Sequence, residues 1–153
     1  MQGLYFLPFQ MDADMNQLVF VYGSLKRGLH NHPLIESAKF VFEALTVEPQ
    51  FRMGNVGPYP EVTRTDTSDG GYLVGEVFHC DPPMMETLDK LEENGVWYQR
   101  HQIEVVPFDA NRVKTTSTMP HLAWCYFWLK PLCPNVSAAY YLEGIPVYNW
   151  QPK

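Results

Sequence analysis

The feature that most constrains the fold is an apolar segment, residues 18–22, that runs directly into a polar turn bounded by glycines. Residues 18–28 read Leu-Val-Phe-Val-Tyr-Gly-Ser-Leu-Lys-Arg-Gly. A continuous apolar run of this length is typical of a strand buried on both faces. The backbone N–H groups that such a turn exposes at the carboxyl end of the strand can hold an anion. The segment therefore predicts a sheet-based domain with an anion-binding turn.

Two better-known glycine-containing turns do not fit this segment. A Walker A loop requires Gly-Lys and then Ser or Thr, whereas Gly28 is followed by Leu29 and His30. A hydrolase nucleophile elbow requires glycine on both sides of the serine, and Ser24 lacks the second glycine. The turn thus carries neither a nucleotide signature nor a nucleophile signature.

The length and charge of the chain indicate one small-molecule-binding domain. The 153 residues are 46% hydrophobic and 14% aromatic, which excludes a mainly disordered chain. We expect residues 1–14 to be an N-terminal extension and residues 15–153 to form a single domain. The formal net charge is −6, and no basic stripe is present to neutralise phosphates, so we expect no nucleic-acid partner.

Three further features of the sequence argue against a disulfide-bonded protein, a secreted or membrane-anchored protein, and a zinc protein. Cys80, Cys125 and Cys133 are an odd number without CxxC spacing, which is typical of reduced thiols in a cytoplasmic protein. The apolar patch at residues 4–9 lacks a basic leader and is too short to span a bilayer, so it predicts neither a signal peptide nor a membrane anchor. The histidines do not join the cysteines at zinc-like spacing, so no metal site is predicted.

Strands outnumber helices in the predicted secondary structure. The predicted strands are residues 18–22, 71–80, 100–106 and 122–129, with a weaker candidate at 39–46. The stretches rich in Pro, Gly and Thr at 49–70 and 107–121 are predicted loops, and a short helix is a candidate around 32–37. Because the connections are too short for a doubly wound sheet, we predict an α+β fold, a small mixed β-barrel flanked by short helices.

One longer helix is predicted after the second of these strands. Asp81 suits the N-cap position, and prolines occupy the first turn. Met84, Leu88 and Leu91 recur at helical spacing, and Asn94-Gly95 is expected to end the helix.

The end of this helix carries the candidate proton carrier. If Leu88 and Leu91 face the core, Glu92 follows on the same side and is partly enclosed, whereas Glu93 turns towards water. The helix dipole and partial burial both raise the pKa of such a carboxyl group, which suits Glu92 to acid/base work. The alternative is that Glu92 and Glu93 form an ordinary solvated helix end.

Five short motifs, in this order along the chain, resemble those of the γ-glutamylcyclotransferase-like family. They are Tyr22-Gly23-Ser24-Leu25, Gly75-Glu76-Val77, Leu88-Asp89 with Glu92, Tyr98 with Arg100, and Ala123-Trp124-Cys125-Tyr126. The motifs are similar to those of the short members of the family, including γ-glutamylamine cyclotransferases. The resemblance implies a small β-barrel flanked by helices, and it puts the acid/base glutamate of active relatives at Glu92.

The resemblance also implies a reaction. Such an enzyme converts a γ-glutamyl amide or amine conjugate into 5-oxoproline and a free amine, because the substrate's own α-amine attacks its γ-carbonyl. No catalytic Ser or Cys, metal or cofactor is then required, and a well-oriented intramolecular attack reaches effective molarities of ~10⁵–10⁸ M. The alternative is a non-catalytic ligand-binding or interaction module on the same fold. The loops at 49–70 and 107–121 are expected to shape the half of the pocket that holds the leaving group.

Each candidate site residue has an expected role. The backbone N–H groups of Gly23, Ser24 and Leu25 are expected to bind the substrate's α-carboxylate or the developing oxyanion. Glu92 is expected to take a proton from the α-ammonium and to deliver it to the leaving nitrogen.

The remaining candidates are expected to position the substrate. Three tyrosines can do so through their hydroxyl groups, and they are Tyr22, Tyr98 and Tyr126. Ordinary barrel packing is the alternative for Tyr22 and Tyr126. Arg100 is expected to pair with a carboxylate of the substrate, and its alternative is a structural ion pair with Asp89 or Glu104.

Overall fold

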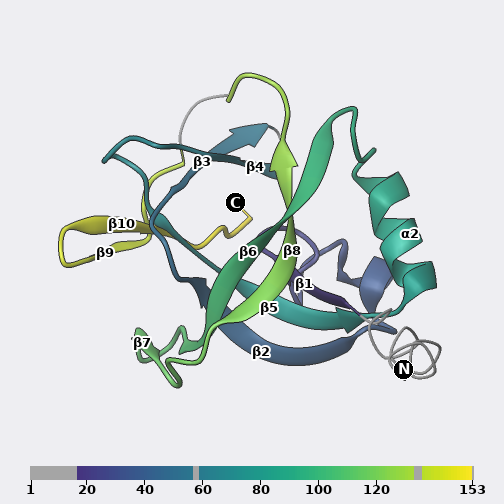
Figure 1. Ribbon diagram of the computed structural model, residues 1–153, viewed down its shortest axis with the longest axis horizontal. Coiled ribbons are helices and arrows are strands. Elements are labelled where there is room, and N and C mark those ends of the chain that lie inside the picture. Colours follow the sequence, from purple (N-terminus) through teal and green to yellow (C-terminus); the bar gives the residue numbers. More distant parts are fainter. Residues whose placement is uncertain (1–16, 57–58, 133–135, 153) are drawn as a thin grey trace, which may run out of the picture.

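The computed structural model describes residues 17–56, 59–132 and 136–152, which form a closed five-stranded β-barrel with added strands and one α-helix (Figure 1). Around the barrel the strands are β1 (Gln17–Val21), β8 (His121–Trp128), β6 (Tyr98–Asp109), β2 (Lys39–Thr46) and β5 (Tyr72–Cys80). β1 closes the barrel, because it pairs antiparallel with β5 and parallel with β8. The predicted mixed β-barrel is confirmed. The expected extension at residues 1–14 lies outside the described residues.

The barrel is filled by side chains from all of its strands. One cluster contains Phe20, Ala44, Val77, Val105 and Cys125, each from a different barrel strand and each almost fully buried. A packed interior of this kind is what a small barrel requires, since its diameter leaves room only for side chains.

Gly75 explains why β1 and β5 can approach so closely. A Cβ atom at this position would lie 2.4 Å from the carbonyl oxygen of Val21 and 2.7 Å from the ring of Phe20. Only glycine therefore fits this point of β5, which lies beside the strand that leads into the turn.

The segment predicted as a loop at 49–70 contains a β-hairpin, so that prediction is wrong. β3 (Phe51–Val56) pairs antiparallel with β4 (Tyr59–Arg64), and β4 lies close to β8. Phe51, Met53 and Val62 are buried in the barrel cluster. The packing of this hairpin over one end of the barrel outweighs the low strand propensity of its glycine and proline residues.

Three short strands extend the sheet. β7 (Lys114–Thr115) pairs with the end of β6, so part of the predicted loop at 107–121 is strand. β9 (Tyr140–Leu142) and β10 (Ile145–Tyr148) form a hairpin, in which β10 pairs parallel with β5. Figure 1 shows this hairpin on the side of the barrel opposite the helix.

The predicted helix is present as α2 (Pro82–Leu91), which packs on the outside of the barrel (Figure 1). The side chain of Asp81 caps it by accepting a hydrogen bond from the backbone N–H of Met84 at 2.9 Å. Leu88 is fully buried, but Leu91 is 43% exposed, so the prediction that Leu91 faces the core is wrong. The second helix candidate is a single 3₁₀ turn, η1 (His32–Ile35). Among the described residues, no helix has the length and apolar character needed to cross a bilayer.

Candidate active site

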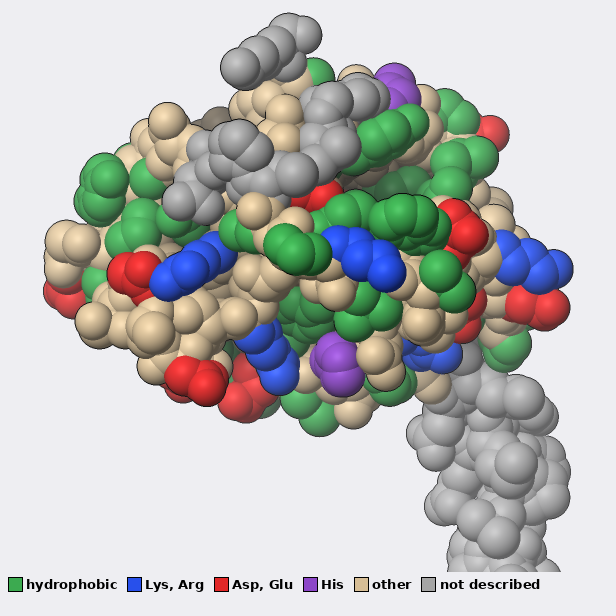
Figure 2. Space-filling model, turned by 90° about the horizontal axis from the view of Figure 1, so that it is seen from above, with side chains coloured by type: hydrophobic (Ala, Val, Ile, Leu, Met, Phe, Trp, Pro, Cys, Tyr) green, Lys and Arg blue, Asp and Glu red, His purple; other side chains and the backbone are tan. Residues whose placement is uncertain are grey.

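A cavity of about 400 Å³ opens at the end of the barrel that the β3–β4 hairpin covers. Its lining comes from five parts of the chain: residues 20–25, Asn31, the start of β4, residues 91–93 and 97–98 at and after the end of α2, and the end of β8. Figure 2 views the molecule from this side and shows hydrophobic side chains across the face, with Lys or Arg side chains between them and acidic side chains mostly around them. The cavity therefore brings together the predicted anion-binding turn and the predicted proton carrier.

The turn after β1 lines this cavity and contains unpaired backbone donors. The backbone N–H of Lys26 donates to the carbonyl of Gly23 at 3.0 Å, and that of Asn31 donates to the carbonyl of Ser24 at 3.1 Å. Within the described ranges, no group accepts a hydrogen bond from the backbone N–H groups of Gly23, Ser24 or Leu25. Consecutive unpaired N–H groups of this kind form a site for an anion.

The hydroxyl of Ser24 takes part in a structural hydrogen bond. Its Oγ accepts a hydrogen bond from Nδ2 of Asn31 at 2.8 Å. The nearby ring of His32 contacts the carbonyl oxygen of Leu25 through Nδ1 at 2.9 Å. This histidine is therefore engaged with the backbone, which agrees with the absence of a nucleophile signature in the sequence.

Gly23 is required by close packing against the hairpin. A Cβ atom on Gly23 would lie 2.6 Å from Cγ and 3.0 Å from Cδ of Pro60. The ring of Pro60 thus presses directly on the turn and fixes its position from the β4 side.

Glu92 is the C-cap residue of α2 and lines the cavity. Burial raises the pKa of its carboxyl group from 4.5 to about 7. A carboxyl group with this pKa holds its proton about half of the time near neutral pH. It can therefore both take and give a proton during one reaction.

The way α2 ends places Glu92. The backbone N–H of Glu93 donates to the carbonyl of Lys90 at 3.2 Å, and that of Asn94 donates to the carbonyl of Asp89 at 2.9 Å. These two bonds are those of a Schellman motif, which requires a left-handed residue after the C-cap. Glu93 supplies it with a φ of 47°, so the helix stops one residue earlier than Asn94-Gly95 predicts.

The three candidate tyrosines line the cavity, and their hydroxyl groups bind the protein. The Tyr22 hydroxyl donates to the carbonyl oxygen of Tyr126 at 2.7 Å. The Tyr126 hydroxyl donates to Oδ1 of Asp89 at 2.5 Å, and the Tyr98 hydroxyl donates to the carbonyl oxygen of Pro60 at 3.4 Å. Burial raises the pKa of all three phenols, so they stay neutral donors. They hold β8, α2 and β4 around the cavity.

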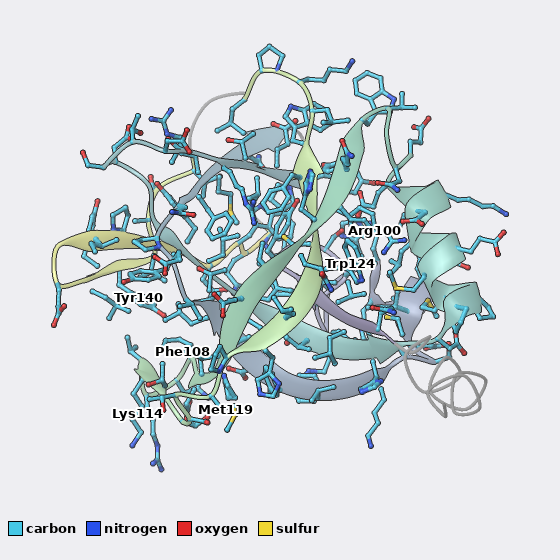
Figure 3. The ribbon with its side chains drawn as sticks, viewed as in Figure 1. Arg100, Phe108, Lys114, Met119, Trp124 and Tyr140 are labelled. Atoms are coloured by element: carbon cyan, nitrogen blue, oxygen red, sulfur yellow. The ribbon has the colours of Figure 1, made fainter. Side chains whose placement is uncertain are left out.

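Arg100 does not lie among the residues that line the cavity. Its Nε lies 3.0 Å from Oδ1 of Asp89, although the N–H is not aligned for a hydrogen bond, and its guanidinium lies over the ring of Trp124 with 4.3 Å to the centroid. Figure 3 shows Arg100 and Trp124 together between the barrel and α2. The structure thus has the ion pair with Asp89 that the sequence left as the alternative.

Several lining residues were not expected from the sequence. Glu61, in β4, is a second carboxylate at the cavity and is only 1% exposed. Trp97 and Trp128 stack with their centroids 5.7 Å apart, and Trp97 is exposed at the mouth. The signal that could have found Glu61 is the dipeptide Gly57-Pro58, which marks a turn between two short segments rich in Val, Phe and Tyr.

No group of three His, Cys, Asp or Glu side chains that could hold a metal ion is found in the described part of the chain. Cys80 and Cys125 are buried free thiols, and burial raises the pKa of both. Cys133 lies outside the described residues.

Known proteins resemble this chain in sequence. It is 28% identical over 113 residues to a putative gamma-glutamylcyclotransferase of Methanocaldococcus jannaschii, covering 73% of this chain and 84% of that protein. It is 36% identical to the human gamma-glutamylaminecyclotransferase over 58% of this chain and 61% of that protein. For gamma-glutamylaminecyclotransferase B of Danio rerio the identity is 37%, and the match spans about half, 49%, of that protein.

Solved structures resemble the chain in fold. An AIG2-like protein of Mus musculus superposes with a TM-score of 0.62 at 22% identity, covering 90% of this chain and 97% of that one. A gamma-glutamyl cyclotransferase superposes with a TM-score of 0.58 at 18% identity, over 78% of this chain and 71% of that one. Residues 19–151 match the family described as gamma-glutamyl cyclotransferase, AIG2-like, and this match includes both the turn after β1 and Glu92. The chain therefore belongs to the gamma-glutamyl cyclotransferase, AIG2-like family.

Proposed function

We propose that the protein is a cyclising enzyme that converts a γ-glutamyl amide or amine conjugate into 5-oxoproline and a free amine. The observation that carries this proposal is that Glu92 and the unpaired N–H groups of residues 23–25 line one cavity. Membership of the family and the names of its relatives support the same reaction. A binding module without turnover has less support, because it gives no reason for a cavity carboxyl group with a pKa of about 7.

In this mechanism the turn binds the substrate's α-carboxylate. A carboxylate carries a full negative charge throughout the reaction, and three backbone N–H groups can satisfy its oxygens. With the carboxylate fixed there, the γ-glutamyl chain folds back so that its α-nitrogen faces its own γ-carbonyl carbon. Holding this folded conformation supplies much of the rate, since the attack is intramolecular.

Glu92 carries protons from the α-nitrogen to the leaving nitrogen. Its ionised carboxylate takes a proton from the α-ammonium, and the freed amine attacks the γ-carbonyl carbon to form the five-membered ring. The protonated Glu92 then gives that proton to the leaving nitrogen as the C–N bond breaks. The second proton that the ring nitrogen must lose passes through the Glu92 carboxylate to the released amine. The products are therefore 5-oxoproline and the amine as its ammonium ion, and Glu92 returns to its ionised starting state.

The exposed mouth of the cavity is assigned to the leaving amine. Tyr59, Leu91 and Trp97 lie there, and each is exposed although large and apolar. Of the charged side chains described in the lining, all are carboxylates: Glu61, Glu92 and Glu93. This combination favours conjugates whose amine half is apolar or cationic and disfavours those whose amine half is anionic.

The experiment is detection of 5-oxoproline from a panel of γ-glutamyl conjugates of neutral, cationic and anionic amines. We expect wild-type turnover with a preference for neutral and cationic amines, and a loss of about 10²–10⁴-fold in Glu92→Gln with the fold intact. Ser24→Ala should retain most of the activity, because the turn acts through its backbone. Retained turnover in Glu92→Gln, or no 5-oxoproline from any member of the panel, would reject the proposal.

A further inference from the structure

Lys26 directly follows the amide-bearing turn, and it is buried. The residue is only 7% exposed, which is unusual for a lysine. Its Nζ donates to the carbonyl oxygen of Trp150 at 2.7 Å and to Oδ1 of Asn149 at 3.0 Å. The side chain therefore links residues 23–25 to a segment more than 120 positions later in the chain.

The segment that Lys26 binds has its own anchor in the barrel. Trp150 is 5% exposed and belongs to the same buried cluster as Tyr22 and Phe20. Its indole Nε1 donates to Oδ1 of Asn55 at 3.2 Å. Trp150 is itself held in place by the core and by its hydrogen bond to β3. The hydrogen bond from Lys26 to Trp150 therefore fixes the position of the turn.

The hydrogen bonds of Lys26 do not neutralise its charge, because both acceptors of its ammonium group are neutral. Glu76 and Glu43, the carboxylates that act on Lys26, also pair with Arg27, whose Nε lies 3.4 Å from Glu76 and whose Nη2 lies 3.9 Å from Glu43. Burial lowers the pKa of Lys26 to about 8, and Glu76 and Glu43 oppose that shift.

We propose that Lys26 is a positioning residue for the substrate's α-carboxylate, because its buried ammonium clamps residues 23–25 to Asn149 and Trp150 and adds positive potential behind their N–H groups. This inference rests on the proposed function, since it assigns the ligand of the turn. Lys26 does not line the cavity, so it acts on the ligand through the turn and not by contact. The backbone N–H groups already favour an anion over a neutral oxygen, and the lysine increases that preference.

The test compares two ligands that differ only in this charge. 5-Oxoproline carries the α-carboxylate, and 5-oxoprolinamide carries a neutral carboxamide in its place. We expect Lys26→Met to weaken binding of 5-oxoproline about tenfold or more, with a much smaller change for the amide. Lys26→Arg should restore most of the preference for 5-oxoproline, and Lys90→Met, on the exposed face of α2, should match wild type. An equal loss for both ligands, or no loss, would overturn the assignment.

Glu92→Gln provides a second measurement with Lys26 intact, because it removes the cavity carboxyl group whose pKa is about 7. In this variant the dissociation constant for 5-oxoproline should rise as the pH passes about 8, where Lys26 loses its proton, while that for the amide stays level. The charged groups that face Lys26 are Arg27, Glu43 and Glu76. A flat profile for both ligands above pH 7.5 would overturn the proposal even if Lys26→Met does not fold. Turnover of γ-glutamyl conjugates by a protein that shows no charge preference would reject Lys26 alone and leave the proposed function standing.

Discussion

The hydroxyl of Tyr126 donates a hydrogen bond of 2.5 Å to Asp89, and this bond joins a barrel strand to the helix that ends in Glu92. Asp89 also pairs with Arg100 from β6, so two neighbouring barrel strands hold the same carboxylate. Asp89 lies one helical turn before Glu92. The position of the proton carrier therefore depends on a side chain that never faces the substrate.

Removing this bond should cost stability. We expect Tyr126→Phe to lower the free energy of unfolding by about 1.5 kcal/mol, because the bond has a charged acceptor but Asp89 is partly exposed. Urea denaturation measures the change. A matched control is Tyr140→Phe, since the Tyr140 hydroxyl is buried and has no hydrogen-bond partner among the described residues, and Figure 3 shows it on the far side of the barrel from α2. That variant should be as stable as wild type or slightly more stable, and equal losses in both variants would contradict the assignment.

The pKa of Glu92 predicts how stability depends on pH. Its folded-state pKa of about 7 lies above the ordinary value of 4.5, so the folded protein binds more protons than the unfolded chain between these values. Stability from this group is therefore present below pH 4.5, falls as the pH rises from 4.5 to 7, and is constant above 7. Between pH 5 and pH 8 we expect the unfolding free energy of wild type to fall by about 2–3 kcal/mol relative to Glu92→Gln. Parallel pH profiles for the two proteins would show that Glu92 titrates normally.

The contact between Gly23 and Pro60 predicts that a substitution of Pro60 will compensate for a substitution of Gly23. We expect Gly23→Ala to lower kcat/KM more than about tenfold and to destabilise the fold by about 1–3 kcal/mol, because the new methyl group meets the proline ring. Pro60→Ala removes the two ring atoms in the way, so the double variant should recover much of both losses. Pro60→Ala alone is the control. If the double variant is as impaired as Gly23→Ala, the turn is sensitive to the methyl group for another reason.

The left-handed backbone of Glu93 predicts a stabilising substitution. We expect Glu93→Gly to raise the free energy of unfolding by about 0.5–1 kcal/mol, because glycine adopts this conformation without a Cβ clash. Val113, with a φ of 55°, lies near the β6–β7 hairpin, and Val113→Gly should give a similar gain remote from the cavity. Thermal unfolding of both variants measures this. A loss of stability in Glu93→Gly would mean that its side chain makes contacts worth more than the strain.

The barrel strands could be predicted from their apolar and β-branched residues, which form a continuous run at 18–22 and alternate with polar residues at 100–106. The β3–β4 hairpin could not, since Gly54, Pro60 and Glu61 all disfavour strands and are held in place by contacts that only the closed barrel provides. Leu91 follows the helical periodicity, yet it lies at the last position of α2, where the core gives way to the cavity mouth.

The placement of the candidate site residues could be predicted where it follows from a local sequence pattern. The turn at 23–25 and Glu92 are each defined by a strand end or a helix end, and these local features survive in the fold. The role of Arg100 could not be decided from the sequence. Whether Arg100 pairs with a substrate carboxylate or with Asp89 depends on how α2 packs on the barrel. The burial of Lys26 could not be predicted from the sequence either, because its partners Asn149 and Trp150 lie more than 120 residues away along the chain.

The closure of the barrel by β1 has a consequence for how the protein is made. β1 is made before the other barrel strands, and its partners β5 and β8 follow some sixty and one hundred residues later, as in the register of Val19 with Phe78 and Trp124. During synthesis both edges of β1 therefore stay unpaired until β5 and β8 have been made, and the turn after β1 acquires its shape only then.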